Sequence, residues 1–279
     1  MNCHAQLWFD HPGQLGELQI GLAGPLWSAF LGGVIFKLSN ILLVAAIDIA
    51  GMAVAFPIGV GLALALGVIT NYIATPVGNP VLLFLGVAGV VLAIILSALA
   101  YRRLPAQGQK TVGKGIAISI AAGVLMGCFY YFVAASMSTD PVNLEPGKLS
   151  PYTAIVIFSV GLLVSNFLWN TIVMKKPFVG QPVQFNEYFS KGTPRLHMIG
   201  ILGGIIWNIG MSLSIIASGA AGFAISYGLG QGATLVAALW GVFIWKEFKS
   251  APAGTGKFLA FMFVSFVIGL SLIVAARVA

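Results

Sequence analysis

The sequence predicts an all-α polytopic membrane protein with about eight transmembrane helices, and three observations support that fold class. The 279 residues are 59% hydrophobic and only 8% charged, and their mean hydropathy is +0.99. Long apolar runs recur along the chain, and many of its 35 glycines lie inside them. A soluble domain cannot hide this much apolar surface, because its exterior needs far more charge. The strict alternation of a membrane β-barrel is absent, so the spans are helices.

Each predicted helix corresponds to an apolar run long enough to cross a bilayer. The glycines inside the runs suit close packing of helices in lipid. The chain divides into a polar tail (1–24), a first repeat of three helices (25–101), a basic cytoplasmic linker (102–113) and a second repeat of five helices (114–279). The runs lie near residues 25–49, 52–74, 79–101, 114–137, 151–174, 198–218, 221–245 and 257–278.

The net charge of +7 is concentrated in three loops that fall on one face of the predicted membrane protein. Cytoplasmic loops carry an excess of Lys and Arg, so these loops are expected in the cytoplasm and both termini outside. The charge therefore reflects topology in the cell inner (plasma) membrane, and no nucleic-acid partner is expected. The basic residues are Arg102, Arg103, Lys110 and Lys114 in one loop, Lys175, Lys176, Lys191 and Arg195 in the second, and Lys246, Lys249 and Lys257 in the third.

An internal duplication organises the chain. The stretch from Leu31 to Leu62 reappears without a gap as Leu202 to Ala233, identical at roughly a third of positions. The first copy opens in the first predicted span and the second copy in the sixth. This offset of five spans is odd, so the copies cross the membrane in opposite directions. This predicts an inverted-topology repeat related by a pseudo-two-fold axis in the membrane plane, as found in transporters.

The predicted spans within 114–174 have no counterpart upstream. A complete arrangement would have five helices in each half, so the sequence predicts a ten-helix carrier fold that lacks its first two helices. Either the chain is shortened at its N-terminus, with a misassigned start as one cause, or the second half acquired two helices. The first explanation is preferred.

Three short motifs add a family resemblance. They are Gly-Gly-x-x-Trp-Asn-x-Gly (203–210), Tyr-Gly-Leu-Gly-Gln (227–231) and Trp-Lys-Glu (245–247). With the repeat, they make residues 25–278 resemble the drug/metabolite transporter superfamily, in its glucose/ribose-uptake and ureide-permease-like branch. The resemblance implies a secondary transporter that moves a sugar or ureide-like solute by alternating access. Two alternatives are an exporter of drugs or metabolites from the same superfamily and a non-transporting, truncated membrane protein.

An enzyme is not expected. The two cysteines, Cys3 and Cys128, and the three histidines form no cluster, and no nucleophile has a neighbouring base. No cofactor or metal is therefore predicted. The expected partners are a small polar solute and the lipid bilayer. Coupling to a proton or to sodium and assembly into a homodimer are both compatible with the sequence.

The second copy of the repeat supplies the first candidate solute-binding residues: Trp207, Asn208, Tyr227, Gln231 and Thr234. Polar groups are costly in lipid, so these side chains should face a cavity or a neighbouring helix. Tyr227, Gln231 and Thr234 follow the i, i+4, i+7 spacing of one helical stripe. Amides donate and accept hydrogen bonds, and aromatic rings stack on sugars or ureide rings. The alternative is that they hold helices together through hydrogen bonds.

The remaining binding candidates lie in the first and fifth spans. Lys37 matches Asn208 in the repeat, and an ammonium in mid-membrane is expensive enough to suggest function. It could bind an anion or carry a proton, or it could snorkel to the interface. Asn40 shares its helix face, and Asn166 and Asn170 form an i, i+4 pair that lines a pore or packs between helices. Tyr130 and its neighbour Tyr131 are expected in an interfacial aromatic belt.

Pro57 and Gly228 occupy matched positions in the two copies. Helix-breaking residues at corresponding points of two halves favour local unwinding, so both are candidate hinges. Simple close packing is the alternative.

Overall fold

The computed structural model is entirely helical apart from one isolated bridge, and it describes residues 12–104, 112–140, 143–246 and 248–279. The predicted tail and basic linker therefore lie partly outside the described residues. The helices are α1 (Pro12–Ala50), α2 (Met52–Ala74), α3 (Pro80–Tyr101), α4 (Val112–Ser136), α5 (Pro151–Lys175), α6 (Phe185–Ser190), α7 (Pro194–Ala221), α8 (Phe223–Gly230), α9 (Gly232–Leu239), the π-helix η2 (Trp240–Ile244) and α10 (Thr255–Val278).

The helices confirm the prediction of an all-α, multi-pass membrane protein. Among the described residues, seven helical segments are long and apolar enough to cross a membrane, against about eight predicted. The remaining predicted span corresponds to α2, a helix of 23 residues that includes the apolar segment Ile58–Ala74. The predicted polar tail (1–24) is partly helical, because α1 already begins at Pro12.

Three helix starts follow directly from local sequence. Each has a polar N-cap residue and a proline at the first helical position, where the missing N–H costs nothing. The Asn79 side chain accepts hydrogen bonds from the backbone N–H groups that open α3, at 3.0 and 3.3 Å. Ser150 caps α5 and Thr193 caps α7 in the same way, at 3.2 and 3.3 Å. These signals place the starts near the predicted positions.

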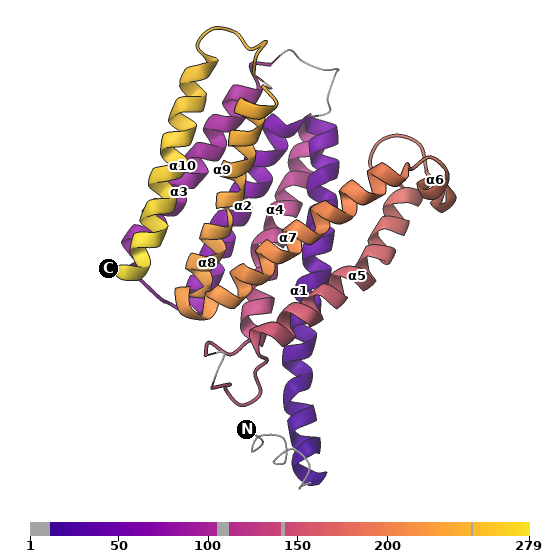
Figure 1. Ribbon diagram of the computed structural model, residues 1–279, viewed down its shortest axis with the longest axis vertical. Coiled ribbons are helices and arrows are strands. Elements are labelled where there is room, and N and C mark those ends of the chain that lie inside the picture. Colours follow the sequence, from indigo (N-terminus) through magenta and orange to yellow (C-terminus); the bar gives the residue numbers. More distant parts are fainter. Residues whose placement is uncertain (1–11, 105–111, 141–142, 247) are drawn as a thin grey trace.

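Glycine allows the helices of the bundle to approach closely. α1 packs against α4 and α5, and α3 packs against α10 (Figure 1). A methyl group on Gly32 would lie 2.7 Å from Val133 of α4, and one on Gly33 would overlap the carbonyl of Phe158 in α5. Gly86 and Gly269 meet at the α3–α10 crossing, where a Cβ on either would lie within 2.8 Å of the other's carbonyl oxygen. Any side chain at these points would separate the helices.

Two junctions have similar backbone geometry. Gly51 separates α1 from α2 with φ 85° and ψ 158°, and Gly222 separates α7 from α8 with φ 91° and ψ 142°. These positive φ angles favour glycine because it lacks a Cβ. The two glycines also occupy matched positions in the sequence repeat.

The final part of the second copy is not one continuous helix. Gln231 forms a turn between α8 and α9, and α9 continues into the π-helix η2. Gly228, the predicted hinge, lies inside α8, three residues before the interruption. Pro57 lies within α2, and its side chain is outside the described residues.

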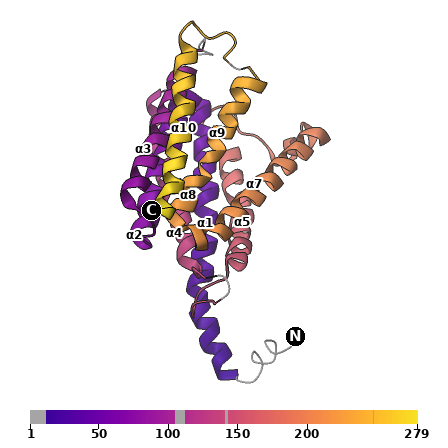
Figure 2. The same ribbon diagram turned by 60° about the vertical axis from the view of Figure 1, so that its left-hand side comes forward.

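One end of the bundle carries the α5–α7 connection and the connection that leads to α10, while α10 ends at the opposite end (Figures 1 and 2). In both views α7 leans away from the bundle toward α6.

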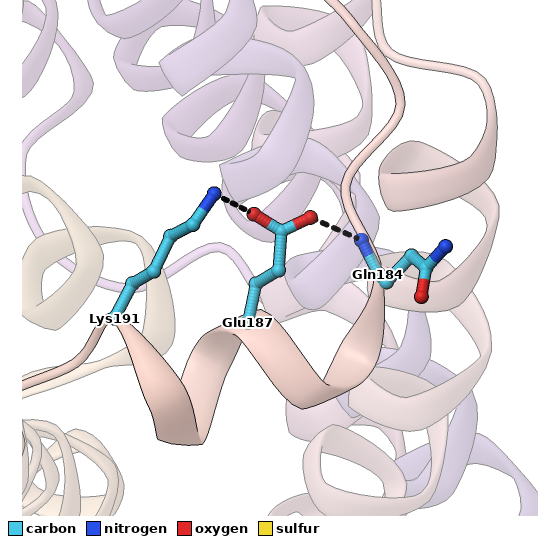
Figure 3. A network of polar contacts seen from close by, with 3 residues as sticks. All are labelled: Gln184, Glu187 and Lys191. Atoms are coloured by element: carbon cyan, nitrogen blue, oxygen red, sulfur yellow. Dashed lines mark hydrogen bonds and ion pairs between the residues drawn. The ribbon is translucent and has the colours of Figure 1, made fainter.

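Figure 3 shows how α6 is stabilised: one oxygen of Glu187 accepts from the backbone N–H of Gln184 at 3.2 Å, and the other pairs with Lys191. The hydrogen bond from Lys191, aided by that from Gln184, holds the pKa of Glu187 below its ordinary value.

Candidate functional site

A vestibule of about 740 Å³ lies between α1, α5 and α7. It runs along α1 from Phe36 to Asp48, close to the helix end, and reaches the loop that follows α5. It therefore extends to the end of the bundle that carries the basic α5–α7 connection. The Lys114 ammonium donates to Phe178 O at 2.9 Å and so ties the start of α4 to this loop. The lining residues are Phe36, Lys37, Asn40, Ile41, Val44, Ala45, Asp48, Leu162, Asn170, Val173, Pro177, Phe178, Val179, Gly204 and Trp207.

The vestibule brings together four predicted site residues: Lys37, Asn40, Asn170 and Trp207. Asn170 donates to Asn166 Oδ1 at 3.0 Å, so the predicted amide pair exists, but only Asn170 lines this cavity. Asp48 lines the same cavity. The vestibule therefore carries charges of both signs beside two amides.

A smaller inner cavity of about 140 Å³ lies deeper, between α1, α4, α7 and α8. Half of its lining residues are aromatic, and it also has one amide and hydroxyl groups, which suit a ring compound able to hydrogen-bond. It brings together the predicted residues Trp207, Tyr227 and Gln231. The full lining is Phe36, Met126, Phe129, Tyr130, Trp207, Met211, Ser214, Tyr227, Gly230 and Gln231.

Tyr227 joins three helices at the inner cavity. Its hydroxyl lies 3.2 Å from Ala63 O of α2 and 3.1 Å from Met126 O of α4, and it donates to these carbonyls. Only 5% of Tyr227 is exposed. The single hydroxyl hydrogen is thus shared between two backbone acceptors, and the ring face is what Tyr227 offers the cavity.

Tyr130 differs from Tyr227 in having no partner. It is 1% exposed, and its hydroxyl is one of three buried side-chain polar atoms in the described chain that lack a hydrogen-bond partner. The expectation of an interfacial position for Tyr130 is therefore wrong, because its ring packs against Tyr227 at 5.3 Å. The hydroxyls of Ser214, Ser218 and Ser226 are the polar neighbours of the Tyr130 hydroxyl, but none of them meets the geometry of a hydrogen bond to it. Ser226 donates instead to Ser214 O at 2.7 Å, and Ser218 donates within its own helix at 2.6 Å. An unpaired buried hydroxyl costs free energy, and a bound solute could satisfy it.

Phe36 and Trp207 belong to both cavities. Their rings stack with centroids 5.0 Å apart and an interplanar angle of 22°. Phe36 is further packed against Phe129 at 4.6 Å and Phe158 at 6.0 Å. Phe36 and Trp207 also occupy matched positions in the repeat.

Three predicted binding residues line neither cavity: Asn166, Asn208 and Thr234. Asn208 is exposed on α7, although its neighbour Trp207 points inward. Thr234 donates to Gln231 O at 2.5 Å and belongs to α9. The interruption at Gln231 takes Thr234 off the stripe that a continuous helix would have formed with Tyr227.

Sequence reasoning missed several cavity residues, among them Phe36, Met126, Phe129 and Ser214. An apolar aromatic residue inside a membrane helix gives no signal of its own. One signal was available for Phe36, because the repeat aligns it with Trp207, a residue already singled out. Within the described residues, no group of three His, Cys, Asp or Glu side chains could hold a metal ion.

Comparison with known proteins gives consistent matches. The family model described as ureide permease matches residues 102–276. The chain is similar to three Arabidopsis thaliana proteins: ureide permease 5 (27% identity, 66% of this chain and 45% of the relative), ureide permease 1 (26%, 66% and 47%) and ureide permease 2 (28%, 60% and 43%). The chain thus spans less than half the length of the curated relatives it matches. No solved structure matches it.

Proposed function

Because the chain belongs to the ureide permease family, we propose that it is a secondary transporter of a small polar solute, with a ureide-like ring compound as the substrate class. The family confirms the ureide-permease-like resemblance and the expectation that the chain is not an enzyme. The solute class rests on the inner cavity. The observation that carries it is the buried, unpartnered hydroxyl of Tyr130 in a cavity that also contains the amide of Gln231.

The inner cavity suits an uncharged, planar solute. Its aromatic walls offer stacking surfaces, Gln231 can donate and accept, and no charged residue lines it. The charged residues Lys37 and Asp48 line only the vestibule. A ureide ring carries several N–H and C=O groups, so it matches an amide and a hydroxyl better than a charged site.

Alternating access between two inverted halves is the proposed mechanism. The similar backbone angles at the matched glycines Gly51 and Gly222 support related halves, and so does the contact between the matched residues Phe36 and Trp207. The helix interruption at Gln231 is typical of carrier sites, where discontinuous helices expose backbone groups to the solute. The vestibule then gives access from the basic, cytoplasmic end. We place the protein in the inner (plasma) membrane on the same charge argument.

Reconstitution tests the proposal. The purified protein in liposomes should accumulate radiolabelled allantoin, a ureide, in preference to labelled glucose and ribose. Gln231→Ala should raise the KM about tenfold, equivalent to about 1.4 kcal/mol of lost binding. Asn208→Ala is the matched control and should leave the KM unchanged, since Asn208 lines neither cavity. Accumulation no faster than in empty liposomes, with a proton or a sodium gradient imposed, would contradict a transport function.

A further inference from the structure

The stacked pair of Phe36 and Trp207 forms the boundary between the vestibule and the inner cavity. Both residues line both cavities, and no other residue is common to the two linings. The ring planes are nearly parallel, at 22°. We propose that this aromatic pair is a gate: in this state it closes the inner cavity toward the vestibule, and it opens when Trp207 moves away from Phe36. This inference rests on the proposed transport function for its biological meaning, but not for its geometry.

Phe36 is the fixed half of the gate. It stacks on Trp207 while also contacting Phe129 of α4 and Phe158 of α5. Its helix is equally constrained, because the nearby glycines Gly32 and Gly33 bring α1 into backbone contact with α4 and α5. Moving Phe36 would require three packed helices to separate.

Trp207 is the movable half. Phe36 is its one aromatic neighbour among the described residues, and 40% of Trp207 is exposed. The glycines at the repeat-matched positions, Gly203 and Gly204, have no atom within 4 Å of the space a methyl group would fill. The same two positions are thus tightly packed in α1 and unpacked in α7. Shifting α7 therefore costs much less free energy than shifting α1.

The gate also limits the size of the solute. The inner cavity of about 140 Å³ is smaller than ordinary small-molecule pockets, which start at about 300 Å³. Removing the Trp207 indole would join the inner cavity to a vestibule of about 740 Å³. Solutes too large to pass the pair would then gain access. Trp207 is therefore expected to determine both access and size selectivity.

A cysteine accessibility experiment tests the gate without any solute. Cys3 and Cys128 are replaced by serine, and Ser214→Cys places a thiol in the inner cavity. A small, charged, membrane-impermeant thiol reagent is applied to the basic face of oriented membrane vesicles. With Trp207 present, labelling should be slow; Trp207→Ala should accelerate it at least tenfold, and Trp207→Phe should give an intermediate rate.

Two controls keep the result interpretable. Ala45→Cys lines the vestibule and should label rapidly whether or not Trp207 is present. Trp27→Ala removes an exposed tryptophan of α1 that lines neither cavity and should leave the Ser214→Cys rate unchanged. If Ser214→Cys labels equally fast with tryptophan, phenylalanine or alanine opposite Phe36, the pair is no gate. If Trp207→Ala accelerates labelling but the protein transports no solute, the gate stands and the proposed function is overturned. Failure of the gate and failure of the proposed function therefore give different results.

Discussion

The ring of Tyr227 in α8 lies directly against Gly67 of α2, and a methyl group on Gly67 would overlap it. The Gly67→Ala substitution should therefore be strongly destabilising. The methyl group must displace a buried ring that is also held by hydrogen bonds to α2 and α4, and overpacking of this kind costs about 1–3 kcal/mol. A lower unfolding temperature of the detergent-solubilised protein measures the effect.

Gly61 provides the matched control for that substitution. It lies in the same helix, but nothing lies within 4 Å of the position its methyl group would take. Gly61→Ala should leave the unfolding temperature unchanged or raise it slightly, because alanine favours helix. Equal destabilisation by both variants would show that α2 rejects alanine generally and that the contact with Tyr227 is not responsible.

Tyr227→Phe isolates the hydroxyl from the ring. The hydroxyl links α8 to α2 and α4 through its hydrogen bonds, and one hydrogen bond contributes about 1 kcal/mol net to the free energy of unfolding. We expect the free energy of unfolding to fall by about that amount. Tyr131→Phe, on a residue that is 41% exposed, is the control and should have no measurable effect. If the two variants behave alike, these hydrogen bonds do not contribute to stability.

Helix starts were predictable because they depend on neighbouring residues. An N-cap side chain followed by proline marks the starts of α3, α5 and α7, and the structure places them at Pro80, Pro151 and Pro194. The interruption at Gln231 has no such local signal. The expected break was at Gly228, yet this residue lies inside α8, beside Ile273 of α10.

The candidate site was predictable only in part, because the direction of a side chain depends on how its helix packs. Sequence spacing placed Trp207 and Asn208 together as candidates, but adjacent residues on a helix point about 100° apart. On α7 the Trp207 ring stacks on Phe36, whereas Asn208 is exposed and lines neither cavity. Tyr130 shows the converse, since its interfacial expectation rested on position along the span and ignored the packing against Tyr227.

Tyr130→Phe should separate stability from binding. The hydroxyl is buried without a partner, so its removal should leave stability unchanged or increase it, because an unpaired buried polar group costs about 1–3 kcal/mol. If the hydroxyl binds solute, the same change should weaken the stabilisation of the protein by added allantoin. Unfolding temperatures with and without allantoin measure both effects. A large loss of stability without ligand would show that Tyr130 has a structural partner instead.

Acidification should loosen α6. Because the pKa of Glu187 is held below its ordinary value by Lys191 and Gln184, the ionised carboxylate stabilises the folded loop. This contribution is fully present above the ordinary pKa of 4.5 and is lost as the pH falls through the lowered value in the folded protein. Hydrogen exchange of the α6 amides should therefore increase below about pH 4 beyond the intrinsic change in rate. Glu187→Gln should show the faster exchange already at pH 7, and a wild-type profile in that variant would exclude Glu187 as the cause.

Lys37 should select for the charge of solutes in the vestibule. It lines the cavity beside Asn40, and no described carboxylate lies within ion-pair distance of its ammonium. A half-buried positive charge attracts anions by about 1 kcal/mol, close to a fivefold change in affinity. Lys37→Gln should therefore weaken inhibition of transport by an anionic, carboxylate-bearing ureide about fivefold and leave the KM for neutral allantoin nearly unchanged. Lys175→Gln, at an exposed position at the end of α5, should alter neither value. An equal loss for neutral and anionic compounds would instead assign Lys37 to the structure of the vestibule.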